Sequence, residues 1–289
     1  MKKLFGLTIA ALLIIGMVGG GTWAYFSDPE ATQNNVLTAG VLDLTRDAAS
    51  NVTTAFLTTG VTNASPGDSN TNSTLLANTA GTIAGELDID LGNITETAGA
   101  TGEFAGGTEL AANLYMAIWL DKNNAGSWNA DDWGLEATAN TKYSYVAGVT
   151  DFVVDSGDTT TIVDAALTEG DDYWNGFKIT ITSGANLNLL GVVTDFDAAS
   201  DTLTVTAFPN AFVAAVTYNL SGPLYYTMAS YDTIGKYDNV LTIAKTGDDG
   251  DDWDFNIEWL IPATVGNAIQ GDAAKFDEIT FTLEQPAAD

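Results

Sequence analysis

Short runs in which apolar and polar residues alternate recur along this chain, and they constrain its fold more than any other feature. In one run Leu87, Ile89 and Leu91 alternate with acidic residues. The same period of two recurs in three further runs: Phe177, Ile179 and Ile181; Phe255, Ile257 and Trp259; and Ile279, Phe281 and Leu283. Successive side chains of a β-strand point to opposite faces, so each run indicates a strand with one buried face. Gly, Asn and Asp separate the runs, and the pattern predicts an all-β sandwich or barrel.

One segment breaks this alternation, because Leu114–Leu120 (LYMAIWL) is apolar throughout. Such a segment predicts a central strand that is covered on both faces. No long amphipathic helix follows the first residues of the chain.

Residues 1–24 have the pattern of a secretory signal helix. Lys2 and Lys3 precede an uncharged, mostly apolar run from Leu4 to Val18, which is short for a membrane span of roughly 20 residues. Three glycines follow, and small residues flank Trp23, which predicts cleavage after Ala24. An uncleaved anchor is the alternative. Both predict export to the extracellular space or cell surface, with no membrane contact once the signal is removed.

The composition excludes several kinds of site and partner. The chain has no Cys and no His, which excludes disulfides, thiolate zinc sites and imidazole chemistry. Its 38 acidic residues against 9 basic ones give a net charge of -29, which repels nucleic acid and attracts cations. A solvated acidic surface and calcium binding both fit this charge, because Ca²⁺ prefers oxygen ligands.

Several stretches carry a family resemblance in order along the chain. They are GGGTWAYFSD at 19–28, VLTAGVLDL at 36–44, the turn at 63–68, NTAGTIAGELDIDL at 78–91 and GNAIQGDAAKFDEITFTLEQ at 266–285. Together they resemble the TasA/camelysin family of secreted fibre-forming proteins, over roughly 25–140 and 223–289. The closing stretch is similar to the family's C-terminal pattern through Asn267, Gln270-Gly271-Asp272 and Gln285.

The resemblance implies a jelly-roll β-sandwich that polymerises head to tail by donating its N-terminal strand to the next copy. The donated strand would run from about Tyr25 to Val36, led by the aromatic residues Tyr25 and Phe26. A sandwich that lacks a strand exposes unpaired backbone groups, which an extended segment from a neighbour can satisfy. The alternative is that Tyr25 and Phe26 fold back onto their own domain as an ordinary first strand.

The camelysin name also carries a protease label, which the composition opposes. A zinc protease of the usual kind needs His ligands, and this chain has none. Carboxylate pairs exist in any acidic chain, but none is placed to suggest a raised pKa. The sequence therefore predicts a structural protein rather than an enzyme. A monomeric, calcium-dependent adhesin of the cell surface or S-layer is the first alternative, and a secreted hydrolase is a weaker one.

The segment Asp121–Asp132 (DKNNAGSWNADD) is the most specific candidate for a metal site. It places oxygen-bearing side chains at the first, third, ninth and twelfth positions and Gly at the sixth, as in a calcium-binding loop. The candidate ligands are Asp121, Asn123, Asn129, Asp131 and Asp132. Ala at the fifth position, Asp in place of Glu at the twelfth and the lack of flanking helices depart from that pattern. A polar turn capped by these side chains is the alternative.

A second acidic cluster precedes the strand at 255–260. Its carboxylates belong to Asp248, Asp249, Asp251, Asp252 and Asp254. Charges this close repel one another unless a cation or solvent screens them. The cluster has two interpretations: a calcium site, which could bridge subunits, or a solvated hairpin tip.

We expect residues 142–222 to form a small β-barrel-like module. It would be inserted into a parent jelly roll formed by residues 25–141 and 223–289. The insert resembles a β module of phage tail and virion structural proteins through TIVD at 161–164, DDYWNG at 171–176 and VTDF at 193–196. A lateral decoration of the fibre, for bundling, adhesion or spacing, and a mere elaboration are both compatible with this position.

Asn-X-Ser/Thr acceptors for N-glycosylation occur at five positions: Asn51, Asn63, Asn72, Asn93 and Asn219. The expected partners are other copies of the chain, with matrix polysaccharide or other cell-surface proteins as further candidates and no nucleic acid.

Overall fold

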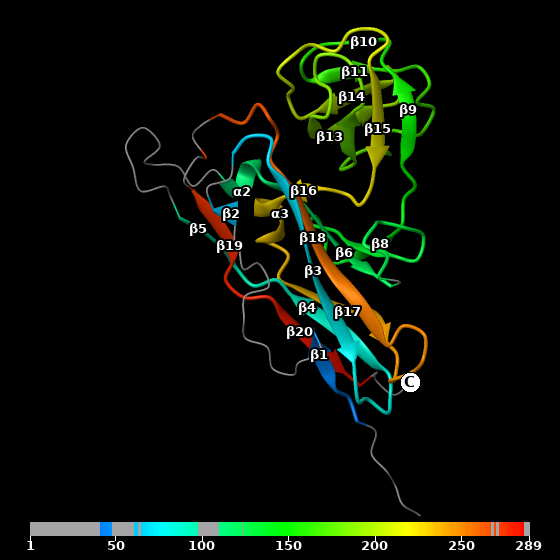
Figure 1. Ribbon diagram of the computed structural model, residues 1–289, viewed down its shortest axis with the longest axis vertical. Coiled ribbons are helices and arrows are strands. Elements are labelled where there is room, and N and C mark those ends of the chain that lie inside the picture. The colour runs from blue at the N-terminus through cyan, green and yellow to red at the C-terminus, as the bar shows by residue number, and fades with distance from the viewer. Residues whose placement is uncertain are drawn as a thin grey trace, which may run out of the picture. The chain divides into compact units, whose positions relative to one another are not determined.

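The computed structural model describes residues 41–47, 61–62, 65–97, 110–122, 124–266, 269 and 272–285. Every described residue belongs to one compact unit, which spans residues 40–289. The predicted signal and the predicted donor residues Tyr25, Phe26 and Val36 lie outside the described residues. Apart from two four-residue helices, the regular elements of the described part are all strands (Figure 1), which confirms the all-β prediction.

One of the two seven-stranded sheets, called the large sheet here, has the order β1-β3-β18-β6-β7-β8, with β16 also paired to β6. Its strands are β1 (Leu44–Arg46), β3 (Ser69–Asn78), β18 (Asp252–Leu260), β6 (Tyr115–Asp121), β7 (Trp133–Leu135), β8 (Lys142–Ser144) and β16 (Tyr226–Thr227). The long strands β3 and β18 run antiparallel side by side (Figure 1). The apolar β6 lies between β18 and β7 and is buried along nearly its whole length, as its sequence predicts.

Two three-stranded sheets supply the strands opposite this sheet. One has the order β17 (Lys236–Ile243), β4 (Gly85–Asp90), β20 (Thr280–Glu284); the other β2 (Val61–Thr62), β19 (Ala273–Phe276), β5 (Ile94–Thr97). The short helices α2 (Leu110–Asn113) and α3 (Met228–Tyr231) accompany them. One continuous apolar core joins these elements to the large sheet, and Ile118, Leu87 and Phe255 are fully buried in it. The parent fold is thus a two-layer sandwich, while the jelly-roll strand order stays a prediction.

Seven strands from the predicted insert form a sheet of their own, in the order β10-β11-β14-β13-β12-β15-β9. They are β9 (Val149–Val153), β10 (Ser156–Gly157), β11 (Thr161–Val163), β12 (Lys178–Ile181), β13 (Leu190–Asp197), β14 (Thr202–Val205) and β15 (Thr217–Ser221). The strands at the two ends of this order, β9 and β10, follow one another directly in the chain, so the sheet must curl to bring its edges together. A separate core fills it, with Trp174, Phe177 and Tyr218 buried.

The chain leaves and re-enters the parent sandwich at adjacent points. β8 pairs with β7 in the large sheet, so the strand at Lys142–Ser144 lies in the parent sheet although the predicted insert begins at residue 142. On the return, the backbone N–H of Leu224 donates to the hydroxyl of Tyr143 at 2.7 Å. Neighbouring entry and exit points are what a module inserted in a loop requires.

Candidate functional site: an acidic pocket and an open sheet edge

The loop after β6 is closed by the two carboxylates at its ends. Asp121 Oδ2 accepts a hydrogen bond from the backbone N–H of Gly126 at 2.8 Å. Asp132 Oδ2 accepts from the N–H of Asn129 at 2.7 Å, and its Oδ1 from the N–H of Lys122 at 3.4 Å. Both carboxylates are almost fully buried. Gly126 has φ of +68°, the left-handed conformation that the sharp turn at this position requires.

Trp128 anchors the same loop to the large sheet. Its ring meets Trp119 of β6 edge to face, with ring centroids 5.8 Å apart. It also lies against Tyr143 and Tyr145, and its indole N–H donates to the carbonyl of Val146 at 3.3 Å. These contacts fix the loop, so Asp121 and Asp132 are held by packing as well as by hydrogen bonds.

In the second acidic cluster, most of the carboxylates have separate protein partners. Asp249 pairs with Lys122 at 2.7 Å and Asp248 with Lys245 at 3.7 Å. Asp251 accepts from the N–H of Gly247 at 2.6 Å, and Asp252 from the side-chain amide of Asn124 at 3.4 Å. The structure therefore does not bring these four carboxylates together around one point.

The fifth carboxylate of this cluster turns towards the first motif. Asp254 of β18 lies directly opposite Asp121 of β6 in the antiparallel ladder, so both side chains stand on the same face of the sheet. Burial raises the pKa of Asp254 above its usual value, and the charges of Asp121, Asp252 and Asp47 add to this rise. Burial likewise raises the pKa of Asp132 to about 6, with Asp121 and Asp131 contributing and the two backbone hydrogen bonds opposing.

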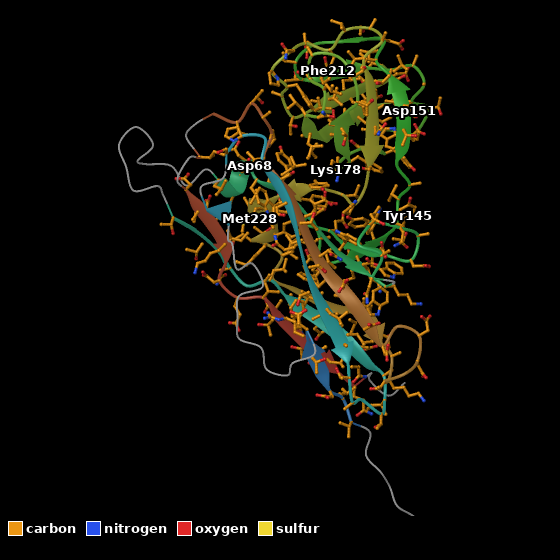
Figure 2. All side chains as sticks on the ribbon, in the orientation of Figure 1. Asp68, Tyr145, Asp151, Lys178, Phe212 and Met228 are labelled. Carbon is orange, nitrogen blue, oxygen red and sulfur yellow. The ribbon has the colours of Figure 1, made fainter. Side chains whose placement is uncertain are left out.

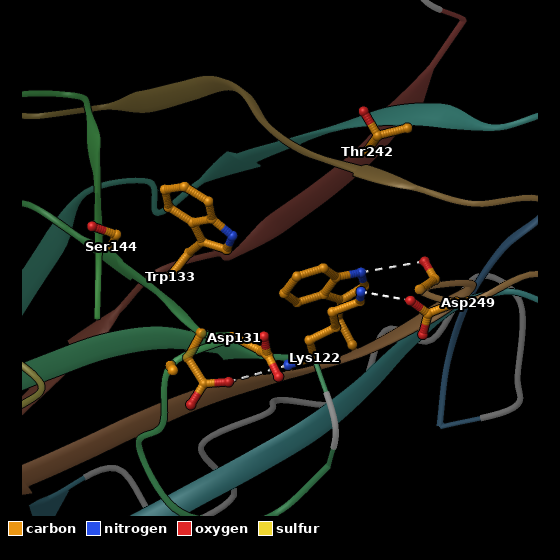
Figure 3. A pocket seen from close by; sticks show the side chains of 10 residues that line it. Lys122, Asp131, Trp133, Ser144, Thr242 and Asp249 are labelled. Atoms are coloured by element: carbon orange, nitrogen blue, oxygen red, sulfur yellow. Dashed lines mark hydrogen bonds and ion pairs between the residues drawn. The ribbon is translucent and has the colours of Figure 1, made fainter. Parts of the chain in front are cut away.

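The two acidic motifs, more than a hundred residues apart in sequence, line one pocket of about 370 Å³. Figure 3 shows Lys122 and Asp249 pointing towards one another across it, joined by their ion pair. The hydrogen bond to Asp249 raises the pKa of Lys122, which keeps this side chain charged. The lining residues are Lys122, Ala130, Asp131, Asp132, Trp133, Ser144, Thr242, Asp249, Gly250 and Trp253.

The sequence identified the acids of this pocket but missed its other functional groups. Trp133, Trp253 and the hydroxyls of Ser144 and Thr242 come from four different strands or their ends. No local pattern marks them. Lys122 was available to sequence reasoning, since it is the one basic residue inside the first motif and an obvious partner for the second.

Asp121 acts electrostatically on both Asp132 and Asp254, which links the two acidic motifs. In the described part of the chain, however, no three acidic side chains are arranged as a metal-binding group. Asn123 lies outside the described residues, while Asn129 caps the loop by accepting from the N–H of Asp131 at 3.1 Å. Calcium at this position therefore stays a proposal.

The second feature of interest is the outer edge of β3. β18 pairs with β3 from Ser69 to Ala77, but β1 covers the other edge only from Leu76 to Asn78. Asp47 extends this contact by one residue, since its N–H donates to the carbonyl of Leu75 and its side chain accepts from the N–H of Leu75. Within the described residues, no strand pairs with this edge from Ser69 to Thr74.

The predicted glycosylation acceptors differ in exposure. Asn93 is exposed, whereas Asn72 on β3 and Asn219 on β15 are half-buried. Asn219 also accepts a hydrogen bond from the N–H of Asp151 at 2.9 Å. Asn51 and Asn63 lie outside the described residues. Asn93 is therefore the described acceptor most accessible to a modifying enzyme.

A comparison with known protein families finds a match at the start of the chain. Residues 1–100 match the family described as camelysin metallo-endopeptidase, while no curated protein matches the chain. The family name describes a metallo-endopeptidase, yet the full chain contains no His and the described residues hold no metal-binding group of acidic side chains. No helix in the described ranges is long and apolar enough to span a membrane. The family is one of secreted or cell-surface proteins and fits a secreted structural or matrix protein. The match confirms the TasA/camelysin family resemblance over residues 1–100.

Proposed function

We propose that this chain is a structural subunit of an extracellular filament or sheath, and that copies join head to tail when the N-terminal segment of one copy pairs with the sandwich of the next. The observation that carries this proposal is the edge of β3 from Ser69 to Thr74, with which no strand of the described residues pairs. A free edge on the main sheet of a sandwich offers a row of backbone donors and acceptors to an added strand.

The hydrogen-bonding direction of β3 follows from its known partners. The N–H and carbonyl of Leu75 face Asp47, on the side away from β18. Because these directions alternate along a strand, the backbone groups of Ser73, Thr71 and Ser69 face the same open side. The N–H of Thr71 bonds to the side chain of Asn70 at 2.9 Å, which is a substitute for a strand partner.

The described residues of this edge include no charged side chain, proline or bulge that would protect it from pairing. The sequence from Ser69 to Thr74 is SNTNST, without Pro, Lys or any other charged residue. Natural edge strands usually carry such residues or bulges to prevent unwanted pairing. An uncharged polar edge about 20 Å long is suited to accept a strand of six residues, and the segment from Tyr25 to Val36 is long enough to supply it.

A proline at Ser73 is expected to stop polymerisation while leaving the sandwich folded. Proline removes the outward N–H of Ser73 without touching the ladder to β18, where it would be far more damaging. The matched control is Ser73→Ala, which keeps the N–H and is expected to form filaments as the unaltered chain does. Negative-stain electron microscopy of both variants, with circular dichroism to verify folding, measures the effect. Filaments of normal length from a folded Ser73→Pro variant would refute the β3 edge as the acceptor.

Calcium is proposed to stabilise the loop between Asp121 and Asp132. Asp121 and Asp132 are buried and Asp254 is half-buried, and the charge of Asp121 raises the pKa of both other carboxyl groups. This supports calcium binding, because a cation would relieve the repulsion. Hydrolytic activity has no comparable support in the described residues, and the structural role is the one proposed.

A further inference from the structure

The inserted module carries an apolar surface that the proposed polymerisation does not use. Val213, Leu187 and Val153 are 61, 51 and 46% exposed, although large apolar side chains are usually buried. Leu187 lies on the connection between β12 and β13, Val213 on the connection between β14 and β15, and Val153 at the end of β9. These three residues are called the apolar tip.

Specific contacts hold the three segments of the tip together. Asn186 and Asn210 clamp the two connections: the side-chain amide of Asn186 donates to the carbonyl of Asn210 at 2.7 Å, and the N–H of Asn210 donates to Asn186 Oδ1 at 3.2 Å. The N–H of Val154 donates to the carbonyl of Val216 at 2.9 Å, which joins the β9 segment. Phe212, next to Val213, is buried beneath this end of the module (Figure 2). The tip is therefore a built surface rather than a set of loose loops.

The tip is also free of charge in a highly charged chain. No charged residue occurs from 183 to 194 or from 202 to 231, whereas the whole chain carries a net charge of -29. The acids closest in sequence to Val153 are Asp151 and Asp155, and both are exposed. Asp155 accepts a hydrogen bond from the backbone N–H of Ala165 at 2.9 Å, and Asp158 accepts one from the N–H of Thr160 at 2.7 Å. An apolar centre with an acidic rim has the anatomy of a protein interface.

We propose that the apolar tip of one chain packs against the apolar tip of a second copy and so links neighbouring filaments side by side. Two copies of so acidic a chain repel one another wherever their charged surfaces meet, and an uncharged apolar surface lets them approach. A tip-to-tip contact uses the same patch on both copies and needs no other partner. One contact of this size is weak, but its repetition along two filaments makes the total strong. This inference rests on the proposed function, because the repetition requires a filament.

The test compares bundling by wild-type filaments with bundling by Leu187→Asp and Val213→Asp filaments. Electron microscopy counts single and bundled filaments, and low-speed sedimentation measures the bundled fraction. Wild-type filaments are expected to bundle increasingly as NaCl rises from 20 to 500 mM, because salt screens their repulsion. Each variant is expected to lower the bundled fraction roughly tenfold or more, since a charge placed in a repeated contact is multiplied along the filament. Ala199→Asp is the matched control: it adds the same charge to an exposed position at the opposite end of β13, and it should bundle as wild type.

The outcomes separate this inference from the proposed function. Single filaments of normal length from the tip variants support the tip contact and leave polymerisation intact. Bundling of the tip variants at the wild-type level, or wild-type filaments that stay single at every salt concentration, would overturn it. If the chain forms no filaments, the proposed function fails, and sedimentation of the concentrated monomer then tests the tip contact by itself. Weak self-association that Leu187→Asp lowers would support the contact; self-association that Leu187→Asp leaves unchanged, or none at the highest soluble concentration, would refute it.

Discussion

A chain that begins at Leu37 is expected to remain monomeric under conditions in which the chain beginning at Tyr25 forms filaments. The truncation removes the donated segment but leaves the accepting edge of β3 unchanged. A synthetic peptide of residues 25–36 is expected to bind the truncated chain and raise its melting temperature, because a ligand that binds only the folded state stabilises it. Electron microscopy, calorimetric titration and thermal unfolding measure these three effects.

The aromatic residues of the peptide allow a sharper test. Burying Tyr25 and Phe26 in the neighbouring copy should contribute about 2 kcal/mol each. A peptide with both replaced by Ser is therefore expected to bind at least about 100-fold more weakly. A peptide of the same composition in scrambled order is the control and should not bind. Filaments from the truncated chain, or equal binding of the scrambled peptide, would show that another segment joins the copies.

Asp132 is expected to make folding stability depend on pH with a slope that calcium reverses. Its pKa is about 6 in the folded chain, against an ordinary value of 3.8, because burial and neighbouring acids disfavour the charge. Between these values the folded state binds a proton that the unfolded state does not. Without calcium, the ionised Asp132 therefore lowers the free energy of unfolding at pH 7. This free energy is expected to increase by up to about 3 kcal/mol as pH falls from 7 towards 4 and the carboxylate is protonated.

Calcium would act in the opposite direction, because it binds the ionised carboxylate. At pH 7 the melting temperature in millimolar calcium is expected to lie above that of the calcium-free chain. In calcium it is expected to fall as pH drops from 7 to 5, because protonation of Asp132 releases the ion. The variant Asp132→Asn should lose both the acid stabilisation and the calcium response, although it also loses one of two backbone hydrogen bonds. Asp151→Asn, an exposed acid on the insert (Figure 2), is the matched control and should keep both.

Thermal unfolding in calcium and in EDTA, at pH 5, 6 and 7, checks both expectations. Equal melting temperatures in calcium and EDTA at pH 7 would remove calcium from the proposed function without affecting strand donation. If the melting temperature of the calcium-free chain depends on pH in the same way with Asp132 and with Asp132→Asn, the raised pKa of Asp132 is contradicted.

Most of the fold class follows from local patterns. The alternating runs at 87–91 and 177–181 place Leu87, Ile89, Ile179 and Ile181 at fully buried positions. The unbroken apolar run at 114–120 became β6. Each is a property of a few consecutive residues, because the side-chain period of a strand is two wherever the strand lies. The neighbours of each strand do not follow from such patterns, and the pairing of β3 with β18, nearly 180 residues away, could not be predicted.

The sequence by itself determined that this chain is all-β, highly acidic and without His or Cys, and it identified both acidic motifs, since residue type and spacing are local facts. Only the tertiary structure decided what these residues do. It placed Asp254 opposite Asp121, joined Lys122 to Asp249 and left the SNTNST edge of β3 open within the described residues. The physical reason is that strand register and charge pairing arise between segments far apart in the chain, and no pattern within either segment records its partner.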